Sequence, residues 1–139
     1  MSKVLVVSAH PDDETLGCGG TLLKHKANGD EIGWLITTNM TKDLGFSEER
    51  IEERQVEIQK VADAYGIKDV FKLDYPTMCL SSETQLTMIP RVSKAISTFQ
   101  PEIIYVLNRS DAHSDHKFTF EAVAACSKSF RHPYIKKIL

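Results

Sequence analysis

Residues 4–14 read Val-Leu-Val-Val-Ser-Ala-His-Pro-Asp-Asp-Glu, and the expected architecture can be worked out from this segment. It opens on a short apolar run, Val4 to Val7, which is typical of a strand buried on both faces of a sheet. A polar turn with one histidine and two aspartates follows at once. The segment therefore predicts a buried strand with chemically reactive side chains at its carboxyl end.

Short β-rich runs alternate with longer amphipathic runs along the rest of the chain. Several boundaries are marked: Asn28-Gly29 ends a helix, Ser47 is a typical N-cap, and Gly66 is a typical helix stop. Pro90 is expected to bend its helix or delay its start. We expect strands over residues 4–7, 31–38, 69–73 and 102–107, and helices over 17–26, 47–65, 82–99 and 116–130.

This order predicts an α/β fold with a Rossmann-like, doubly wound, mostly parallel sheet and helices on both faces. In the common strand order 3-2-1-4, the first and fourth strands are neighbours, and ligands bind at their carboxyl ends. The segment Ala9–Glu14 follows the first strand, and His113-Ser114-Asp115-His116 follows the fourth. We therefore expect these two motifs to face the same crevice, although they are far apart in the sequence.

Histidine and carboxylate ligands suit zinc, and catalytic zinc sites use three protein ligands and leave a position for water. We expect His10, Asp13 and His116 to hold Zn²⁺, with the metal-bound water as nucleophile at neutral pH. Taken singly, each residue has a simpler explanation, because aspartates cap helices and histidines occur in loops and on surfaces. The coincidence of two such clusters at adjacent strand ends favours a metal site.

Three further polar residues of the motifs remain for proton transfer and orientation. Asp12 is the expected general base, which takes a proton from the attacking water. His113 is expected to stabilise the developing oxyanion or to protonate the leaving nitrogen. Asp115 is expected to hold the His113 imidazole in one tautomer, as carboxylates do for catalytic histidines.

At these residues the chain resembles the LmbE-like, or PIG-L, family of zinc-dependent N-deacetylases, from residue 3 to its end. The resemblance implies removal of an acetyl group from an N-acetylglucosamine-type sugar or sugar conjugate. It also implies the same zinc ligands, the same general base and the same role for His113 as the residues themselves suggest. The family often carries an arginine that approaches the sugar, so Arg54 is a tentative substrate contact, with a surface helix residue as the alternative.

Family members are usually longer than these 139 residues, and Ile135–Leu139 looks like the start of another strand. We therefore expect residues 1–139 to be a single deacetylase domain that lacks the family's C-terminal portion. Both motifs are present, so metal binding should survive such a truncation. An exposed apolar edge would favour homo-oligomerisation.

Composition narrows the functional classes. The net charge of −2 and the absence of a basic block argue against nucleic acid as a partner. No apolar run is long enough for a membrane span, and three widely spaced cysteines suggest no disulfide framework, so a cytoplasmic protein is expected. Three alternatives stay open: an amidase acting on a thiol conjugate, an inactive zinc-binding scaffold, and a nucleotide-binding module suggested by Gly17-x-Gly19-Gly20.

Overall fold

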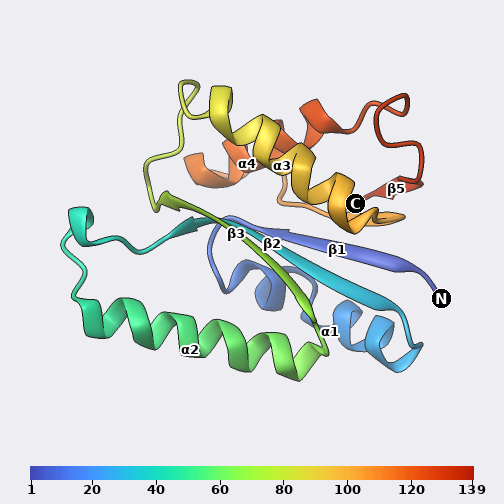
Figure 1. Cartoon of the computed structure of the whole chain (residues 1–139), viewed down its shortest axis with the longest axis horizontal. Coiled ribbons are helices and arrows are strands. Elements are labelled where there is room, and N and C mark those ends of the chain that lie inside the picture. The colour runs from blue at the N-terminus through green and yellow to red at the C-terminus, as the bar shows by residue number, and fades with distance from the viewer.

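A computed structural model describes the whole chain, residues 1–139, as a five-stranded sheet with helices on both faces (Figure 1). The strand order is β3-β2-β1-β4-β5, and every neighbouring pair is parallel. This confirms the predicted Rossmann-like sheet and the predicted pairing of the first and fourth strands. In chain order the elements are β1 (Lys3–Ser8), α1 (Asp13–Ala27), β2 (Glu31–Asn39), a 3₁₀ turn (Lys42–Leu44), α2 (Glu48–Tyr65), β3 (Asp69–Pro76), α3 (Gln85–Phe99), β4 (Ile103–Tyr105), α4 (Ser114–Cys126) and β5 (Lys137–Ile138).

Two apolar layers hold the helices against the sheet. Helices α1 and α2 cover one face and α3 and α4 the other, as Figure 1 shows. Successive residues of a strand point to opposite faces, so Trp34 of β2 packs into the layer with α1 and α2. Its neighbour Leu35 packs into the layer with α3 and α4. Because β1 and β2 are buried on both faces, the loops at their carboxyl ends stand on a rigid support.

Helix α1 differs most from the expectation. It begins at Asp13, four residues before the predicted start, and it is interrupted at Cys18, where φ is −147° and ψ is 25°. The predicted helix corresponds to the part after this kink. Glycine lowers helix propensity, and Gly17, Gly19 and Gly20 surround the kink. The part of α1 before Cys18 is therefore a separate turn, and it begins within the polar motif, at Asp13.

Other boundaries shift by a few residues. Helix α3 starts at Gln85 instead of 82, after a turn in which Ser81 and Thr84 bond each other's backbone amides, and Pro90 lies within the helix. Helix α4 starts at Ser114, two residues early, because His113 acts as its N-cap. The strand expected at the end of the chain is present as β5, which pairs in parallel with β4.

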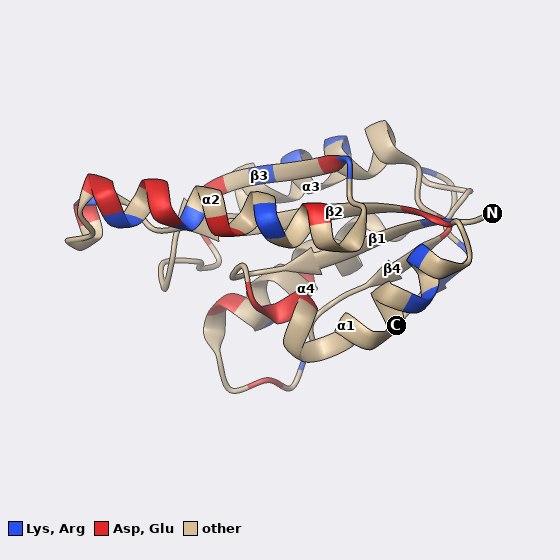
Figure 2. Cartoon of the chain, turned by 90° about the horizontal axis from the view of Figure 1, so that it is seen from below, with Lys and Arg blue, Asp and Glu red and all other residues tan.

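Charged residues are unevenly spread, and acidic side chains gather along α2 (Figure 2). Within this helix Arg50 and Arg54 each lie 3.1 Å from a carboxylate oxygen of Glu57. Such exposed pairs contribute little to stability, about 0–1 kcal/mol each. None of the helices combines the length and the hydropathy that a membrane crossing requires.

Gly33 in β2 offers a test of the packing. A Cβ there would lie 2.9 Å from ring carbons of Phe99 in α3, closer than real contacts allow. We expect Gly33→Ala to destabilise the fold by about 1–3 kcal/mol, because the ring must shift in a packed core. Gly20→Ala is the matched control, since nothing lies within 4 Å of its Cβ position. Urea denaturation measures both, and equal stabilities would contradict the packing described.

Candidate metal centre

The first motif forms a tight loop at the carboxyl end of β1. The Asp13 Oδ2 atom accepts hydrogen bonds from the backbone N–H groups of Ala9 and His10, both at 2.9 Å. On the other side, the Ala9 carbonyl accepts from the Thr38 hydroxyl at 2.6 Å and from the Thr38 N–H at 3.1 Å. The loop is thus tied both to its own aspartate and to β2.

A buried carboxyl group secures the start of α1. Glu14 is only 1% exposed, and it accepts a hydrogen bond from the Ser8 hydroxyl at 3.1 Å. That hydroxyl in turn accepts from the Trp34 indole N–H at 2.9 Å. Burial raises the pKa of Glu14, against the smaller effect of its hydrogen bonds. Glu14 therefore connects the first turn of α1 to the sheet through the hydrogen bond from Ser8. This role is separate from the favourable effect of an acidic residue at a helix start.

The second motif opens α4, just beyond β4. Because β4 lies beside β1, the loops after these strands meet, and His10, Asp13 and His116 come together. One donor atom from each of the three lies within 4.8 Å of the others. The Asp13 Oδ1 atom is 3.2 Å from His116 Nε2, and Asp13 Oδ2 is 4.0 Å from His10 Nδ1. The structure thus places the three predicted ligands in one cluster.

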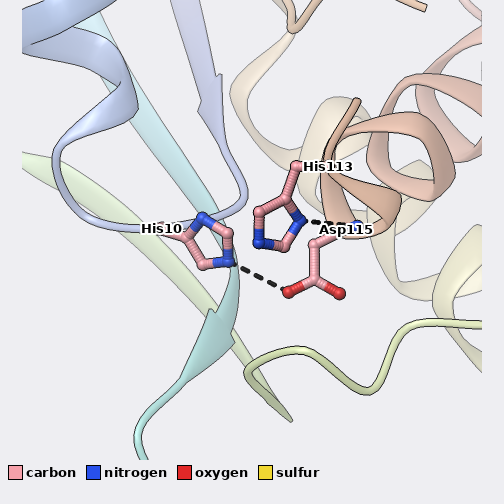
Figure 3. Close-up of side chains that lie close together, drawn as sticks. All are labelled: His10, His113 and Asp115. Carbon is pink, nitrogen blue, oxygen red and sulfur yellow. Dashed lines mark hydrogen bonds and ion pairs between the residues drawn. The ribbon is translucent and has the colours of Figure 1, made fainter. Parts of the chain in front are cut away.

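Asp115 has a different partner from the one expected. Its carboxylate lies 2.9 Å from His10 Nε2 (Figure 3). It also accepts the backbone N–H groups of Met78 at 2.7 Å and Leu80 at 3.2 Å. The expected side-chain support of His113 is absent from this arrangement. Instead, the backbone N–H of Asp115 donates to His113 Nδ1 at 3.1 Å. Asp115 therefore supports a predicted metal ligand directly and His113 only through its backbone.

The hydrogen bond between Asp115 and His10 has consequences for both groups. It raises the pKa of His10, against the opposing effect of burial. Burial alone would raise the pKa of Asp115, but the bonds from His10, Met78 and Leu80 lower it. An ionised carboxylate only accepts, so His10 Nε2 carries the proton. In the neutral ring, His10 Nδ1, the atom on the Asp13 side, then has its lone pair for a metal.

The donor set fits a divalent ion. A second group, His10, His113 and Asp115, also brings its donor atoms within 4.8 Å. In that group, however, the Asp115 oxygens already accept three hydrogen bonds, and His113 Nδ1 accepts one. In the cluster of His10, Asp13 and His116, by contrast, both backbone hydrogen bonds to Asp13 go to Oδ2, and Oδ1 accepts none. The composition of two imidazoles and one carboxylate is that of a catalytic zinc site.

The two expected proton-transfer residues have contrasting surroundings. The Asp12 side chain is exposed and makes no hydrogen bond within the chain, although its residue is the N-cap of α1. His113 is half-buried, with its ring centroid 4.7 Å from that of His10. Since His113 Nδ1 accepts a hydrogen bond, the proton of the neutral ring is on Nε2. His113 is thereby prepared as a donor, and Asp12 is available as an acceptor.

Two cavities flank the ligand cluster. One, of about 210 Å³, is lined by His10, Thr77 and Arg54 among others. The Arg54 Nε atom is buried without a hydrogen-bond partner, and Nη1 pairs with Glu57. An unpaired buried N–H is uncommon in proteins and favours an acceptor that arrives with a ligand. The structure thus places Arg54 beside the cluster.

The other cavity, of about 470 Å³, is mostly apolar, with Asp13 and His116 in its wall. Cys18 also lines it. Burial raises the pKa of this thiol to about 11, so it is protonated at neutral pH. Cys18 lies outside both groups of metal-type side chains.

Asp111 is a residue that sequence reasoning missed. Its Oδ1 atom accepts the backbone N–H of His113 at 2.9 Å, and its Oδ2 atom lies 3.0 Å from His116 Nδ1. An aspartate that bonds the N–H two residues on is a recognisable turn signal. That spacing was present in the sequence as Asp111-x-His113. The contact with the His116 ring could not be read from it.

Two curated proteins are similar in sequence to this chain. A probable N-acetyl-alpha-D-glucosaminyl L-malate deacetylase 2 of Bacillus anthracis is 28% identical over 129 residues, covering 87% of this chain and 57% of that protein. A diacetylchitobiose deacetylase of Thermococcus kodakarensis is 29% identical over 128 residues, covering 84% of this chain and 46% of that protein. The chain therefore spans about half the length of these curated relatives.

Solved structures carry the same fold. The conserved protein TT1542 from Thermus thermophilus superimposes with a TM-score of 0.76 at 26% identity, covering 99% of this chain and 64% of that one. The family model described as GlcNAc-PI de-N-acetylase matches residues 5–127, which include both motifs. With most of its length matched by that model, the chain belongs to the PIG-L family.

Proposed function

We propose that this chain carries the metal-dependent catalytic centre of a zinc N-deacetylase that acts on an N-acetylglucosamine-type substrate. One observation carries the proposal: Asp13 and His116, from motifs at opposite ends of the chain, meet at 3.2 Å beside His10. Two imidazoles and a carboxylate at the carboxyl ends of adjacent parallel strands are suited to a catalytic metal.

The relatives support the substrate class. Both curated relatives described above are named as deacetylases, and the name of each contains an acetylated glucosamine unit, carried on malate in one and in a disaccharide in the other. The family model is likewise described by an N-acetylglucosamine conjugate. The shared chemistry is an acetamide on a glucosamine ring, while the carrier differs. We therefore propose the acetamide as the reacting group.

Water is the second reactant, and Asp12 is the proposed general base. When bound, a divalent ion in such a site polarises an acyl oxygen and lowers the pKa of water. Asp12 follows the loop that holds His10 and precedes Asp13, so it is adjacent in sequence to the ligand set. Its exposed carboxylate has no partner within the chain, so its oxygens are free to accept a proton from the attacking water.

His113 is the proposed partner of the leaving group. Its Nε2–H donates to the developing oxyanion or delivers a proton to the departing amine. The Asp115 backbone N–H fixes this tautomer through Nδ1. The ring also packs at a 63° angle to that of His10, which holds it beside the ligand cluster. The acid and the base thus come from different motifs.

Arg54 is the proposed sugar contact. It lines the smaller cavity together with His10, and its Nε–H has no partner in the chain. We propose that the guanidinium group donates from this cavity wall to a sugar hydroxyl or carbonyl oxygen.

The first test is acetate release by zinc-reconstituted protein from N-acetylglucosamine, N,N′-diacetylchitobiose and a nucleotide-linked N-acetylglucosamine. We expect zinc-dependent release, and Asp12→Ala should lower kcat by about 10²–10⁴-fold, the usual contribution of a general base. Zinc content should stay at one equivalent, because the Asp12 side chain bonds none of the ligands and alanine keeps the backbone bond to His10. Asp43→Ala removes another exposed carboxylate and serves as the control.

Two results would contradict the proposal. Stoichiometric zinc without acetate release from any of these substrates would indicate a metal-binding scaffold. Full activity of Asp12→Ala would remove Asp12 from the reaction.

A second test concerns substrate binding by Arg54. We expect Arg54→Ala to raise KM by about 10-fold or more, since a hydrogen bond from a charged donor is lost, with a smaller effect on kcat. Arg50→Ala is the matched control, because Arg50 pairs with the same Glu57 one turn away and is absent from the cavity wall. Steady-state kinetics of both variants decide, and equal KM values would rule out the contact.

A further inference from the structure

The carboxylate of Asp111 connects two parts of the second motif. Its Oδ1 atom accepts the backbone N–H of His113, the N-cap residue of α4, at 2.9 Å. Its Oδ2 atom lies 3.0 Å from Nδ1 of the His116 ring, whose Nε2 is 3.2 Å from Asp13. One side chain thus touches both the backbone before α4 and the ring of a proposed ligand.

We propose that Asp111 is a positioning residue for the metal centre, which holds His116 in the tautomer that binds the ion. A carboxylate only accepts, so Asp111 keeps the proton of a neutral His116 ring on Nδ1, and Nε2, on the Asp13 side, would then have its lone pair for an ion held between the two. Partners of this kind fix ring orientation and raise the basicity of the metal-binding nitrogen. This inference rests on the proposed metal site and concerns a residue outside both motifs.

The arrangement matches the one at the other histidine of the cluster. His10 Nε2 faces the carboxylate of Asp115, and this leaves Nδ1 on the Asp13 side. His116 Nδ1 faces the carboxylate of Asp111, and this leaves Nε2 on the Asp13 side. In the neutral tautomers that these second carboxylates favour, both rings turn the nitrogen that would bind an ion toward the shared aspartate.

The two bonds of Asp111 can be separated by substitution. Asparagine keeps an oxygen that accepts the His113 N–H, but it places an amide NH₂ opposite His116 Nδ1. A donor would then face a donor, and the ring must move its proton to Nε2 or rotate away. The Asp111 side chain is 39% exposed, so this change leaves no buried polar group without water. Folding should therefore be affected little.

Zinc affinity of Asp111→Asn, measured by competition with a chromophoric chelator, tests the proposal. We expect an affinity about 10- to 100-fold below that of the unaltered chain, as for other partners of metal-binding histidines. The visible spectrum of the Co²⁺-loaded variant should change as well. The melting temperature of the metal-free protein should not, because the backbone bond is kept. Asp43→Asn, at an exposed aspartate outside both groups of metal-type side chains, should match the unaltered chain in all three measurements.

Equal zinc affinities and equal Co²⁺ spectra for Asp111→Asn and the unaltered chain would overturn the inference and leave the proposed function standing. An unaltered chain that binds no zinc would overturn the proposed function and this inference with it. Asp111→Ser provides a second variant if the first folds poorly. Its hydroxyl can accept the His113 N–H but is one bond too short for the His116 ring, so the same loss of affinity is expected.

Discussion

The two oxygens of the Asp13 carboxylate have different partners, and the rest of the site is arranged around that division. Oδ2 accepts two successive backbone N–H groups, which closes the loop after β1 and fixes the direction in which His10 leaves the backbone. Oδ1 faces His116 from the other motif. Asp13 therefore both closes its own loop and brings that loop against the second motif, while the bonds from Thr38 to the Ala9 carbonyl attach the loop to β2.

The sheet supplies the constraint that brings the motifs together. Parallel strands need long crossover connections, so two loops at the same edge come from distant parts of the sequence. In this chain β1 lies between β2 and β4, and the winding reverses between β1 and β4. The chain leaves β1 for the face covered by α1 and leaves β4 for the face covered by α4, so side chains from both loops can converge between them. The cluster is a direct consequence of strand order.

Much of this could be predicted from the sequence because it depends on local patterns and on topology. Buried strands have continuous apolar runs, and Ser47 and Gly66 mark the ends of α2 by well-understood backbone chemistry. Strand neighbours follow from the handedness of crossovers. The convergence of His10, Asp13 and His116 needed only these rules, because each ligand follows a strand directly or after a short loop.

The partners of each polar group could not be predicted in the same way. Asp115 was expected against His113, its neighbour in sequence, but its buried carboxylate turns toward His10 and toward the loop after β3. Which partner an aspartate takes depends on side-chain direction at a helix start, and no spacing rule specifies it. The contact between Asp111 and His116 is hidden for the same reason, since the turn signal identifies only the backbone bond.

The loop after β3 shares an acceptor with the His10 ring. The backbone N–H groups of Met78 and Leu80 donate to the Asp115 carboxylate, which also accepts the hydrogen bond from His10 Nε2. Met78 has a φ of 68°, which is unusual for a residue other than glycine. A shift of this loop that withdrew its donors would concentrate the charge of Asp115 on His10 alone. Loop position and the donor strength of His10 are therefore thermodynamically linked. By reciprocity, an ion bound at His10 would bias the conformation of the loop after β3, a segment outside the proposed ligand set.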